Sequence, residues 1–523
     1  MNAKTGKTMQ RVRILVQVIF TLIFFVLLLK SGNARVESFT FTDYFFYFDP
    51  LLLLLNFLAT GKVMAIFLLA LIPLVLTLIL GRFFCGWVCP MGAVQQFFTW
   101  VFRTGKNNKK KKKEEVSRPL LKLKYLILLA VVVAAIMGTH LGGWLDPFSI
   151  LTRSSALAIN PAVNYSLHQA LKGGAEDTGI IAKGLKPAYN FARKNILTQN
   201  QRVYTQSIIV GLIFLGLVLL NFVKRRFFCN YLCPLGAMYG LVSRVSLFNL
   251  KADHKCVSCG ACANHCTYSG SPYKDYMKSE CMTCFNCVSD CPTDAVAVSF
   301  ALPKKENRTT IDIGRRQWIG SAAVALFLAS LPRTFVQAKA KVHGFLRPPG
   351  SVKETEFLAK CVRCGQCMQV CPTNFIQPAS LETGLEGMWT PILNAQTGYC
   401  EYECNKCMQV CPTQAIQKLA LEEKKKFKMG IAVIDKNRCY TYADGYNCAV
   451  CEEHCPIPEK AIRFREVDTW NFKGELVKVN QIYVKPELCT GCGICENKCP
   501  RIDAPGIIMT AEEEEREAVY GYE

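Results

Sequence analysis

The sequence predicts a multi-domain protein in which an α-helical membrane domain is followed by small cysteine-rich α+β modules. Two observations carry this prediction. Long apolar runs occupy the first half of the chain, and most of the 28 cysteines among 523 residues fall in regular groups in the second half. Because 51% of the residues are also hydrophobic, the composition excludes an ordinary soluble enzyme.

The charge balance is strongly basic, with 62 Lys and Arg against 40 Asp and Glu. The basic residues crowd beside the apolar runs and in one tract at Lys109–Lys113. This placement favours cytoplasmic anchoring of membrane helices over nucleic-acid binding, with simple solubility as the remaining explanation. We therefore expect membrane lipid as a partner and no nucleic acid.

Four apolar runs are expected to cross the membrane as helices, since their flanks lengthen each toward the roughly 20 residues that a bilayer requires. They are Ile14–Leu29, Val63–Leu80, Tyr125–Gly138 and Ser207–Val223. Basic residues precede the first run, separate the second from the third and follow the fourth, which predicts both ends of this domain in the cytoplasm. The shorter run Pro50–Phe57 is expected to be re-entrant or interfacial, and Pro73 is expected to kink the second helix.

The membrane domain contains an internal repeat of two helices. In each half an outer loop carries Asp-Pro, and the second helix ends in Arg-Phe-Phe-Cys followed by Cys-Pro-x-Gly-Ala. Two spans per half make the repeat parallel, which predicts one cytoplasmic depth for four thiols. These belong to Cys85, Cys89, Cys229 and Cys233. Three interpretations stay open: one shared metal or iron–sulfur centre, a redox-active dithiol or disulfide relay, or structural free thiols.

The other 24 cysteines fall into six groups of four. In C-x2-C-x2-C-x3-C spacing, three thiolates wrap one iron–sulfur cube and the fourth ligates the neighbouring cube. The first two groups therefore predict a double-[4Fe–4S] ferredoxin module at residues 251–300. One cluster takes Cys256, Cys259, Cys262 and Cys291, and the other takes Cys281, Cys284, Cys287 and Cys266.

Four further groups follow between residues 341 and 523, and a proline follows the last cysteine of each. Two are regular: Cys361, Cys364, Cys367, Cys371 and Cys489, Cys492, Cys495, Cys499. Two open with longer gaps: Cys400, Cys404, Cys407, Cys411 and Cys439, Cys448, Cys451, Cys455. The pairing is either between neighbours or first with fourth and second with third. Disulfides would not need this regularity, and zinc sites usually use two separated pairs, so we expect six [4Fe–4S] clusters.

Between the second and third groups lies a linker, residues 301–340. It contains Arg315-Arg316, the apolar stretch Gly320–Leu331 and Ala338-Lys339-Ala340, which together resemble an internal twin-arginine export signal. A short membrane helix is the alternative, and either takes the chain from inside to outside. We therefore expect residues 1–250 in the bacterial inner membrane, 251–300 in the cytoplasm and 341–523 in the periplasm; a buried cytoplasmic helix would keep the last part inside.

These features resemble the NapH and NapG proteins of periplasmic nitrate respiration joined in one chain. Residues 1–300 resemble NapH, while the part from Arg315 onward, including Leu346-Arg347-Pro348-Pro349-Gly350, is similar to NapG. The resemblance implies an electron-transfer component of a quinol dehydrogenase that passes electrons from the quinone pool to a periplasmic reductase or cytochrome. Whether the chain is itself an enzyme stays open. The alternative is an electron-donating maturation or regulatory factor for another metalloprotein, as in NosR-like and CcoG-like proteins.

A quinol site needs groups that accept protons, because a quinol that loses two electrons also releases two protons. Asp49 and Asp146, in equivalent outer loops, are the candidate carboxylates, with helix capping or a turn as their alternative role. Arg82 and Arg226 are expected to act as topology anchors. No C-x-x-C-H motif occurs, which excludes attached c-type haem.

Overall fold

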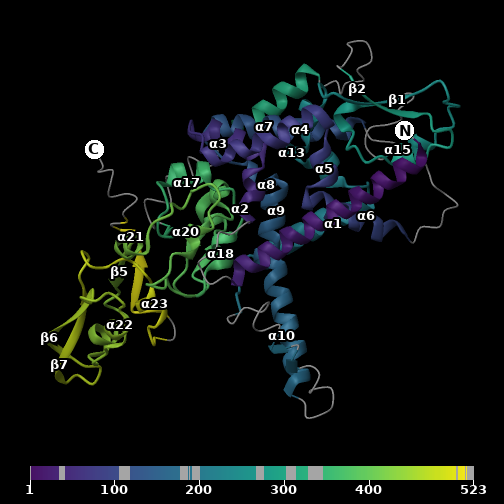
Figure 1. Cartoon of the computed structure of the whole chain (residues 1–523). Coiled ribbons are helices and arrows are strands. Elements are labelled where there is room, and N and C mark those ends of the chain that lie inside the picture. Colours follow the sequence, from purple (N-terminus) through teal and green to yellow (C-terminus); the bar gives the residue numbers. More distant parts are fainter. Residues whose placement is uncertain are drawn as a thin grey trace. The chain divides into compact units, whose positions relative to one another are not determined.

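The structure is a computed structural model, and it describes residues 2–33, 42–104, 118–176, 186–187, 189–190, 201–266, 276–301, 314–324, 326–327, 345–501, 504–512 and 514. The chain divides into two compact units (Figure 1). Unit 1 comprises residues 1–30, 41–154 and 209–329, and unit 2 comprises 31–40, 155–208 and 330–523. Residues 251–300 thus belong to the same unit as the apolar helices, and 155–208 to the same unit as the C-terminal region.

Unit 1 is mainly helical up to residue 243. Its elements are α1 (Ala3–Asn33, whose last residues enter unit 2), α2 (Thr42–Tyr47), α3 (Pro50–Thr60), η1 (Ala65–Ala70), α4 (Leu71–Leu80), α5 (Phe83–Trp87), α6 (Pro90–Thr104), α7 (Arg118–Ile136), α8 (Gly142–Leu145), α9 (Pro147–Ser154), α12 (Ser207–Leu219), η4 (Leu220–Phe222), η5 (Phe228–Leu232) and α13 (Pro234–Ser243).

Apolar helices occur at all four predicted spans, but they differ in length. Among the described residues, two are long and apolar enough to cross a membrane, Ala3–Leu29 and Pro119–Ile136. Ala65–Leu80 and Ser207–Phe222 are shorter apolar helices, as is Pro50–Thr60. The structure therefore supports the helices themselves, and the four-span topology remains a prediction.

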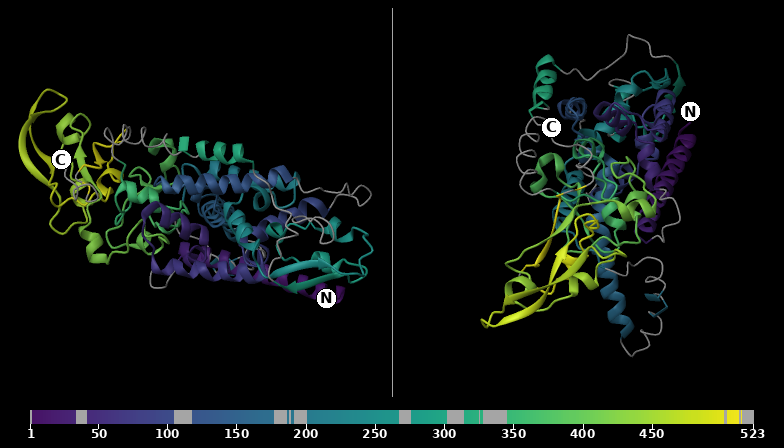
Figure 2. Two further views of the ribbon diagram at one scale, coloured as in Figure 1. Left: turned by 90° about the horizontal axis from the view of Figure 1, so that it is seen from above. Right: turned by 90° about the vertical axis from the view of Figure 1, so that its left-hand side faces the viewer.

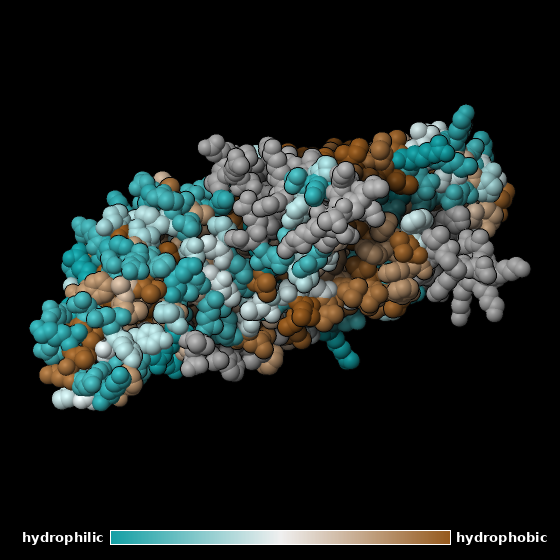
Figure 3. Space-filling view, turned by 90° about the horizontal axis from the view of Figure 1, so that it is seen from below, coloured by the Kyte–Doolittle hydropathy of each residue, from teal (hydrophilic) through white to brown (hydrophobic). Residues whose placement is uncertain are grey.

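Much of the surface of these helices is apolar. Large hydrophobic side chains are exposed along α1, α4 and α12, including Leu15 at 60%, Val75 at 52% and Ile208 at 73%. Figure 3 shows a broad apolar area on one face of the molecule. An exposed apolar area of this extent is typical of a surface that meets lipid or another protein.

Pro73 lies at a change of helix type. The 3₁₀-helix η1 ends at Ala70 and α4 begins at Leu71, so Pro73 stands in the first turn of α4, where its missing N–H has no helical partner to lose. The hydroxyl of Thr77 donates to the carbonyl of Pro73 at 2.7 Å. The break expected near this proline therefore takes the form of a 3₁₀-to-α junction.

The cysteine-rich end of unit 1 is an α+β module. Strand β1 (Phe248–Ala252) pairs antiparallel with β2 (Val296–Phe300), with Phe248 opposite Phe300. Between them lie α14 (Ala261–His265), η6 (Lys278–Glu280) and α15 (Asn286–Ser289). Phe248, Leu250, Val288 and Val296 form a core together with cysteines of the module and Trp87 of α5.

The segment 155–208 of unit 2 contains η3 (Ser155–Ile159) and the long α10 (Asn160–Glu176), and α10 can be followed in Figure 2. The C-terminal region supplies α17 (Glu354–Lys360), α18 (Gln366–Val370), η8 (Leu381–Thr383), α19 (Gly384–Gly387), α20 (Lys406–Gln409), α21 (Leu421–Lys426), η9 (Tyr440–Asp444), α22 (Val450–Glu453) and α23 (Ile494–Asn497).

Three antiparallel strand pairs complete unit 2. They join β3 (Ile376–Pro378) to β4 (Pro391–Leu393), β5 (Ile431–Ile434) to β8 (Ile507–Thr510), and β6 (Ile462–Trp470) to β7 (Leu476–Val484). Each pair is too small to be stable alone. The buried cysteines Cys439, Cys451, Cys489 and Cys495 lie in the same core as Ile507, so the thiol groups form part of the interior of these modules.

The twin-arginine segment is only partly described. Residues 315–324 are helical, and Trp318 and Ile319 are exposed. Residues 325 and 328–331 of the apolar stretch, and Ala338-Lys339-Ala340, lie outside the described residues. The export signal therefore stays a prediction.

Candidate iron–sulfur centres

Two groups of four thiols gather in unit 1. Cys256, Cys259, Cys262 and Cys291 line one cavity of about 340 Å³. Cys266, Cys281, Cys284 and Cys287 lie within electrostatic range of one another. In each group three thiols come from one run and the fourth from the other, which is the exchange that the spacing predicts.

The loops that bring three thiols together share an unusual backbone. In four of the six runs, the second and fourth residues after the first cysteine both have left-handed dihedral angles: Ser258 and Gly260, Thr283 and Phe285, Arg363 and Gly365, and Gly491 and Gly493. Left-handed residues turn the chain sharply, so the three thiols face one side of the loop. The runs that begin at Cys400 and Cys439, whose spacing departs from the pattern, lack this pair of angles in the described residues.

Unit 2 holds four more groups of thiols. The first is Cys361, Cys364, Cys367 and Cys411, around a cavity of about 370 Å³. The second is Cys371, Cys400, Cys404 and Cys407, around about 350 Å³. The third is Cys455, Cys489, Cys492 and Cys495, around about 330 Å³. In the fourth, Cys439, Cys448 and Cys499 lie near Cys451.

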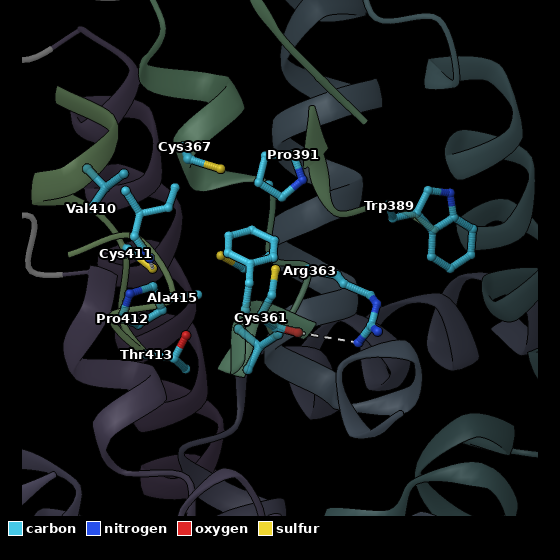
Figure 4. A pocket seen from close by; sticks show the side chains of 15 residues that line it. Cys361, Arg363, Cys367, Trp389, Pro391, Val410, Cys411, Pro412, Thr413 and Ala415 are labelled. Carbon is cyan, nitrogen blue, oxygen red and sulfur yellow. Dashed lines mark hydrogen bonds between the residues drawn. The ribbon is translucent and has the colours of Figure 1, made fainter. Parts of the chain in front are cut away.

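These sets decide the pairing that the sequence left open. The third and fourth runs of the chain exchange their last cysteines, and so do the fifth and sixth. Figure 4 shows the first of these groups, with the sulfur atoms of Cys361, Cys367 and Cys411 turned toward the same space. Arg363 lies beside this space and donates to the carbonyl of Cys361 at 3.3 Å. Neighbouring runs therefore pair, and the first-with-fourth alternative is wrong for these groups.

The four groups of unit 2 follow one another in a row. Cys367 of the first group lies near Cys407 of the second. The backbone N–H of Cys400 in the second donates to the carbonyl of Cys492 in the third at 2.8 Å. In the third group Cys495 lies near Cys451 of the fourth. Each group thus neighbours the next through cysteine residues themselves.

The thiols are held where ionisation is unfavourable without a cation. Burial raises the pKa of Cys367 well above its ordinary value, and the nearby Cys364 and Cys361 raise it further. Burial also raises the pKa of Cys281 to about 12 and that of Cys411 to about 11. Four buried thiols can all become thiolates only where positive charge balances them, as iron does in a cluster.

Backbone N–H groups point at the cysteine that three of the runs give to a neighbour. The N–H of Ala295 donates to Cys291 Sγ at 3.2 Å, that of Ile416 to Cys411 Sγ at 3.4 Å, and that of Gly506 to Cys499 Sγ at 3.3 Å. For Cys291 burial acts to raise the pKa, but these backbone and hydroxyl donors lower it below the ordinary value. Such N–H···S bonds stabilise thiolate and tune cluster potentials.

The donor set and the cavities suit [4Fe–4S] clusters. Three groups in unit 2 and one in unit 1 each line a pocket with four thiols and mostly apolar residues. A zinc site would hold its thiolates about 2.3 Å from one metal ion. Within the described part of the chain, no three His, Cys, Asp or Glu side chains are gathered closely enough to hold one metal ion.

The four cysteines of the membrane repeat also come together. Cys233 lies within electrostatic range of Cys229, Cys85 and Cys89, and Cys89 within range of Cys229 and Cys85. All four are free of disulfides, and three of them are buried. The repeat therefore gathers two thiols from each half, as a shared centre requires.

The Cys-Pro-x-Gly sequence explains how each half presents its thiol. Cys233 is the N-cap of α13, Pro234 is the first helical residue, and the N–H of Gly236 donates to Cys233 Sγ at 3.2 Å. Cys89 receives the same kind of bond from Gly92 before α6. Glycine is required because a Cβ on Gly92 would lie 2.8 Å from the carbonyl oxygen of Cys85. Each thiol thus caps a helix N-terminus, where negative charge is favoured.

Arg82 and Arg226 are buried, which corrects their assignment as topology anchors. Their exposures are 0% and 1%. Arg82 Nη1 binds Glu280 Oε2 at 2.9 Å and the carbonyl of Ser279 at 3.1 Å, and Arg226 Nη1 donates to Met282 Sδ at 3.3 Å. Both arginines therefore fasten the loop that carries Cys281 and Cys284 to the repeat, because a buried guanidinium is stable only when it is paired.

Glu280 is the centre of this contact and was not identified from the sequence. Lys124 also forms an ion pair with it, and the hydroxyl of Tyr125 donates to Glu280 Oε1 at 2.7 Å. Burial acts to raise the pKa of Glu280, but the charges of Lys124 and Arg82 lower it below the ordinary value. A glutamate directly before a cysteine run has no sequence pattern that marks it.

Arg82 also offers hydrogen-bond donors toward the four thiols. Its Nε and Nη2 atoms have no hydrogen-bond partner among the described residues. The guanidinium lies within electrostatic range of Cys85 and Cys233, and a Cβ on Gly236 would lie 3.0 Å from Nη2. Buried unsatisfied donors are costly, so these two N–H positions fit a negatively charged group held by the cysteines.

Asp49 and Asp146 both cap helices, the alternative role foreseen for them. Asp49 accepts from the N–H of Leu51 at 2.8 Å at the start of α3, and Asp146 from that of Ser149 at 2.7 Å at the start of α9. Both are fully buried, and their carboxyl groups lie within electrostatic range of each other. The sequence indicated their equivalence but not their proximity.

Arg347 is a further structural residue of unit 2. It is fully buried, binds Glu354 through Nη2 at 2.5 Å and donates to the carbonyl of Pro391 at 2.7 Å. Its guanidinium lies 4.7 Å from the ring centre of Phe357, which lines the cavity of the first thiol group. The Leu-Arg-Pro-Pro-Gly sequence therefore fixes one wall of that cavity.

Comparison with protein families identifies iron–sulfur domains along the chain. A model described as "4Fe-4S binding domain" matches residues 63–109 and again 206–252, one copy in each half of the repeat. A "4Fe-4S dicluster domain" matches residues 360–415, the segment whose two runs exchange cysteines. Two further "4Fe-4S binding domain" models match residues 253–269 and 482–501.

Curated relatives resemble this chain over part of its length. The chain is 35% identical over 196 residues to "Ferredoxin-type protein NapG" of Escherichia coli (strain K12), covering 36% of this chain and 81% of the relative. It is 34% identical over 202 residues to "Methylamine utilization ferredoxin-type protein MauM" of Methylorubrum extorquens, covering 38% and 87%. An uncharacterized protein of Methanocaldococcus jannaschii, MJ0749, is 25% identical over 296 residues, covering 56% and 89%. No solved structure matches the chain.

Proposed function

Because the chain belongs to the family of NapG and MauM ferredoxin-type iron–sulfur proteins, we propose that it oxidises quinol in the membrane and delivers the electrons to an exported redox partner. One observation carries this proposal. The thiols of an apolar helical repeat meet beside a ferredoxin loop, which Arg82 and Arg226 hold in place. A soluble carrier has no need for such a junction.

The 24 cysteines of the six groups are the proposed ligands of six [4Fe–4S] clusters. Cys85, Cys89, Cys229 and Cys233 are the proposed ligands of one further iron–sulfur centre, with Arg82 as a hydrogen-bond donor to it. When bound, these groups supply one-electron transfer between neighbouring sites. The protein's own part is to hold thiolates, exclude water and set hydrogen bonds to sulfur.

The proposed topology places the C-terminal domain in the periplasm. In the four-span arrangement, the segment between the third and fourth spans lies outside. That segment packs within unit 2: the hydroxyl of Tyr204 donates to the carbonyl of Met368 at 3.1 Å, and Asn374 Nδ2 donates to the carbonyl of Val203 at 2.7 Å. These contacts support an outer position for residues 341–523, opposite the module at 251–300.

The fusion of a NapH-like and a NapG-like part is likewise a proposal. The matches to NapG and MauM account for less than two fifths of this chain, and the repeat at residues 63–252 lies in separate matched domains. Joining the two parts in one chain would keep the membrane centre and the four exported groups at a fixed ratio.

A second candidate function is electron donation for the maturation or regulation of another metalloprotein. It is compatible with the range of relatives, because NapG and the methylamine-utilization protein MauM are similarly close to this chain. The family therefore does not by itself fix the acceptor. A maturation factor need not draw electrons from the quinone pool, which gives the means to separate the two functions.

The test is reduction of the oxygen-free purified protein by quinols. Menaquinol and ubiquinol analogues are added anaerobically, and bleaching of the iron–sulfur absorption is followed, with dithionite as the reference for full reduction. The proposed function predicts that at least one quinol reduces the protein. Reduction by dithionite alone, with no response to either quinol, would favour the maturation role.

A further inference from the structure

The tip of the β6–β7 hairpin exposes large apolar side chains. Trp470 at the end of β6 is 66% exposed, and Phe472 in the turn and Leu476 at the start of β7 are each 62% exposed. Trp470 and Leu476 are directly opposite each other on the two strands, so their side chains lie on the same face of the hairpin. These three residues and the exposed Tyr446 are called the apolar tip below. Exposed aromatic residues gathered in this way are typical of a surface that another molecule covers.

The hairpin is held against the loop between the first two cysteines of the fifth run. This loop, residues 440–447, has eight residues where the regular runs have two, and it is called the supporting loop below. The hydroxyl of Tyr442 in the loop donates to the carbonyl of Ile482 in β7 at 2.8 Å. The N–H of Asn480 in β7 donates to Asn447 Oδ1 at 2.8 Å. The longer gap of this run therefore supplies the support on which the hairpin rests.

The supporting loop also reaches the apolar tip itself. The rings of Tyr446 and Phe472 lie 5.5 Å apart between centres. A Cβ on Gly445 would lie 2.8 Å from Asn471 Cα, so the backbone of the loop touches the turn of the hairpin directly. Tyr446 stands two residues before Cys448. The tip is thus built partly from the segment that carries two thiols of the fourth group.

The fourth group of thiols adjoins the supporting loop. A Cβ on Gly506 would lie 2.7 Å from Cys439 Cα, and the N–H of Gly506 donates to Cys499 Sγ at 3.3 Å, so this glycine links the two cysteines. Arg501, two residues after Cys499, forms an ion pair with Asp444 of the loop at 2.5 Å. Cys439 also shares a core with cysteines of the third group. The row of groups in unit 2 therefore ends next to the loop that supports the apolar tip, and in Figure 1 the hairpin lies beside α22, at the edge of this unit.

The charges around the tip are largely balanced within the chain. Lys478 pairs with Glu466 across the hairpin at 3.0 Å. Glu475 accepts a hydrogen bond at 2.9 Å from the side chain of Asn471 in the turn, and the ammonium of Lys473 lies 5.7 Å from the ring centre of Phe472. A molecule that covers the tip is therefore recognised by its apolar surface more than by its net charge.

We propose that the apolar tip is the docking surface for a one-electron carrier protein that takes electrons from the fourth group. This inference rests on the proposed function, because it assigns the point at which electrons from quinol leave the chain. The partner is a small protein whose cofactor edge lies in an apolar surface patch. In each exchange the cluster bound by the fourth group loses one electron, the partner's cofactor gains it, and no bond or proton is transferred.

The support of the tip favours a redox partner over lipid. A hairpin that only anchors a protein to a membrane has no need to rest on a cysteine-bearing loop. A docking surface for electron transfer must adjoin a redox group, and the supporting loop joins the tip to the fourth group in this way.

The test measures electron transfer from the full-length protein to a soluble c-type cytochrome, a small carrier whose haem edge lies in apolar surroundings. The protein is purified without oxygen, reduced by dithionite, desalted and mixed with oxidised cytochrome in a stopped-flow instrument. W470A should lower the second-order rate constant roughly 10-fold. The rate at saturating cytochrome and the iron content should not change, because no thiol is touched.

Two leucines of similar exposure provide a matched control. Leu476 of the tip is 62% exposed, and Leu381 of η8, outside the hairpin and the supporting loop, is 66% exposed. L476S should slow the reaction at low cytochrome concentration, whereas L381S should keep the wild-type rate constant. Equal melting temperatures of the two variants show that neither change acts through the fold.

Photo-crosslinking supplies a second readout that does not depend on electron transfer. Benzoylphenylalanine in place of Phe472 should crosslink to the cytochrome, and the same group in place of Leu381 should not. Wild-type rate constants in both W470A and L476S, or equal crosslinking from the two positions, would overturn the inference. It would also be overturned if brominated lipid in nanodiscs quenched the fluorescence that W470F removes, or if the wild type formed a dimer that W470A lacks, because lipid or a second copy would then cover the tip.

These outcomes are independent of quinol, because dithionite supplies the electrons. A wild-type protein that passes electrons to the cytochrome through the tip but is not reduced by quinol would contradict the proposed function and leave the docking surface in place. A protein that quinol reduces, with tip variants that react like the wild type, would contradict the docking surface alone.

Discussion

The six groups of closely spaced cysteines and the four cysteines of the membrane repeat gather their thiols by different means. In most of the six, a local left-handed loop turns three thiols to one side, and a neighbouring run supplies the fourth. In the repeat, each half supplies two thiols, and the set exists only where the two halves meet. The first kind of site depends on local backbone, the second on the packing of unit 1.

The largest effect should come from removing a thiol. Removing one from a cysteine run should affect a single cluster, whereas removing one from the repeat should stop reduction by quinol. C367S should cost one cluster, about four iron atoms per chain, and leave unit 1 unchanged. C229S should remove the repeat centre and abolish reduction by quinol, while dithionite still reduces the six other groups. Iron analysis and quinol titration of the two variants check this contrast. If C229S responds to quinol like the wild type, the repeat centre is not the entry point.

The next effect should come from Glu280, which joins the two kinds of site. E280A leaves the buried Arg82 and Lys124 without their shared partner, and breaking a buried pair in this way costs about 3–5 kcal/mol. Thermal unfolding in detergent should show it. The control is E356A, whose partner Lys360 lies in a partly exposed ion pair worth about 0–1 kcal/mol. Equal losses in both variants would mean that Glu280 does not organise the junction.

A smaller effect is expected where the ferredoxin loop approaches the repeat most closely. A Cβ at Gly86 would collide with the carbonyl oxygen of Met282, whereas one at Gly216 would meet no atom within 4 Å. G86A should therefore cost about 1–3 kcal/mol through overpacking, and G216A should be neutral or slightly stabilising because alanine favours helices. Melting temperatures of the two variants provide the comparison. A stable G86A protein would show that the loop is not held against α5.

The smallest effect concerns pH. Because the folded-state pKa of Glu280 is lowered, its contribution to stability is fully present above the unfolded value near 4.5 and is lost as the pH falls through the lower folded value. The difference in melting temperature between wild type and E280Q should therefore be larger at pH 7 than at pH 4. A difference that stays constant over this range would contradict the pairing of Glu280 with Arg82 and Lys124.

The sequence was most informative for cysteines that lie close together along the chain. Spacing alone grouped Cys256, Cys259 and Cys262 with Cys291, since the C-x2-C-x2-C loop and the proline after the fourth cysteine leave few arrangements. It could not decide the partner of Cys361, because exchange with Cys411 or with a later run depends on how the chain returns between them.

Tertiary contacts were the part that could not be read from the sequence. The positive-inside rule assigns any arginine beside an apolar run to anchoring, so it missed that Arg82 and Arg226 turn inward. The repeat showed that Asp49 and Asp146 are equivalent, but equivalence does not require proximity.

The central claim is that the grouped thiols hold iron–sulfur clusters, and a count of iron and acid-labile sulfide on protein purified without oxygen tests it most directly. Six [4Fe–4S] clusters predict about 24 of each per chain, and a cluster at the repeat centre raises this to about 28. A colourless protein with almost no iron, or with zinc in its place, would contradict the account.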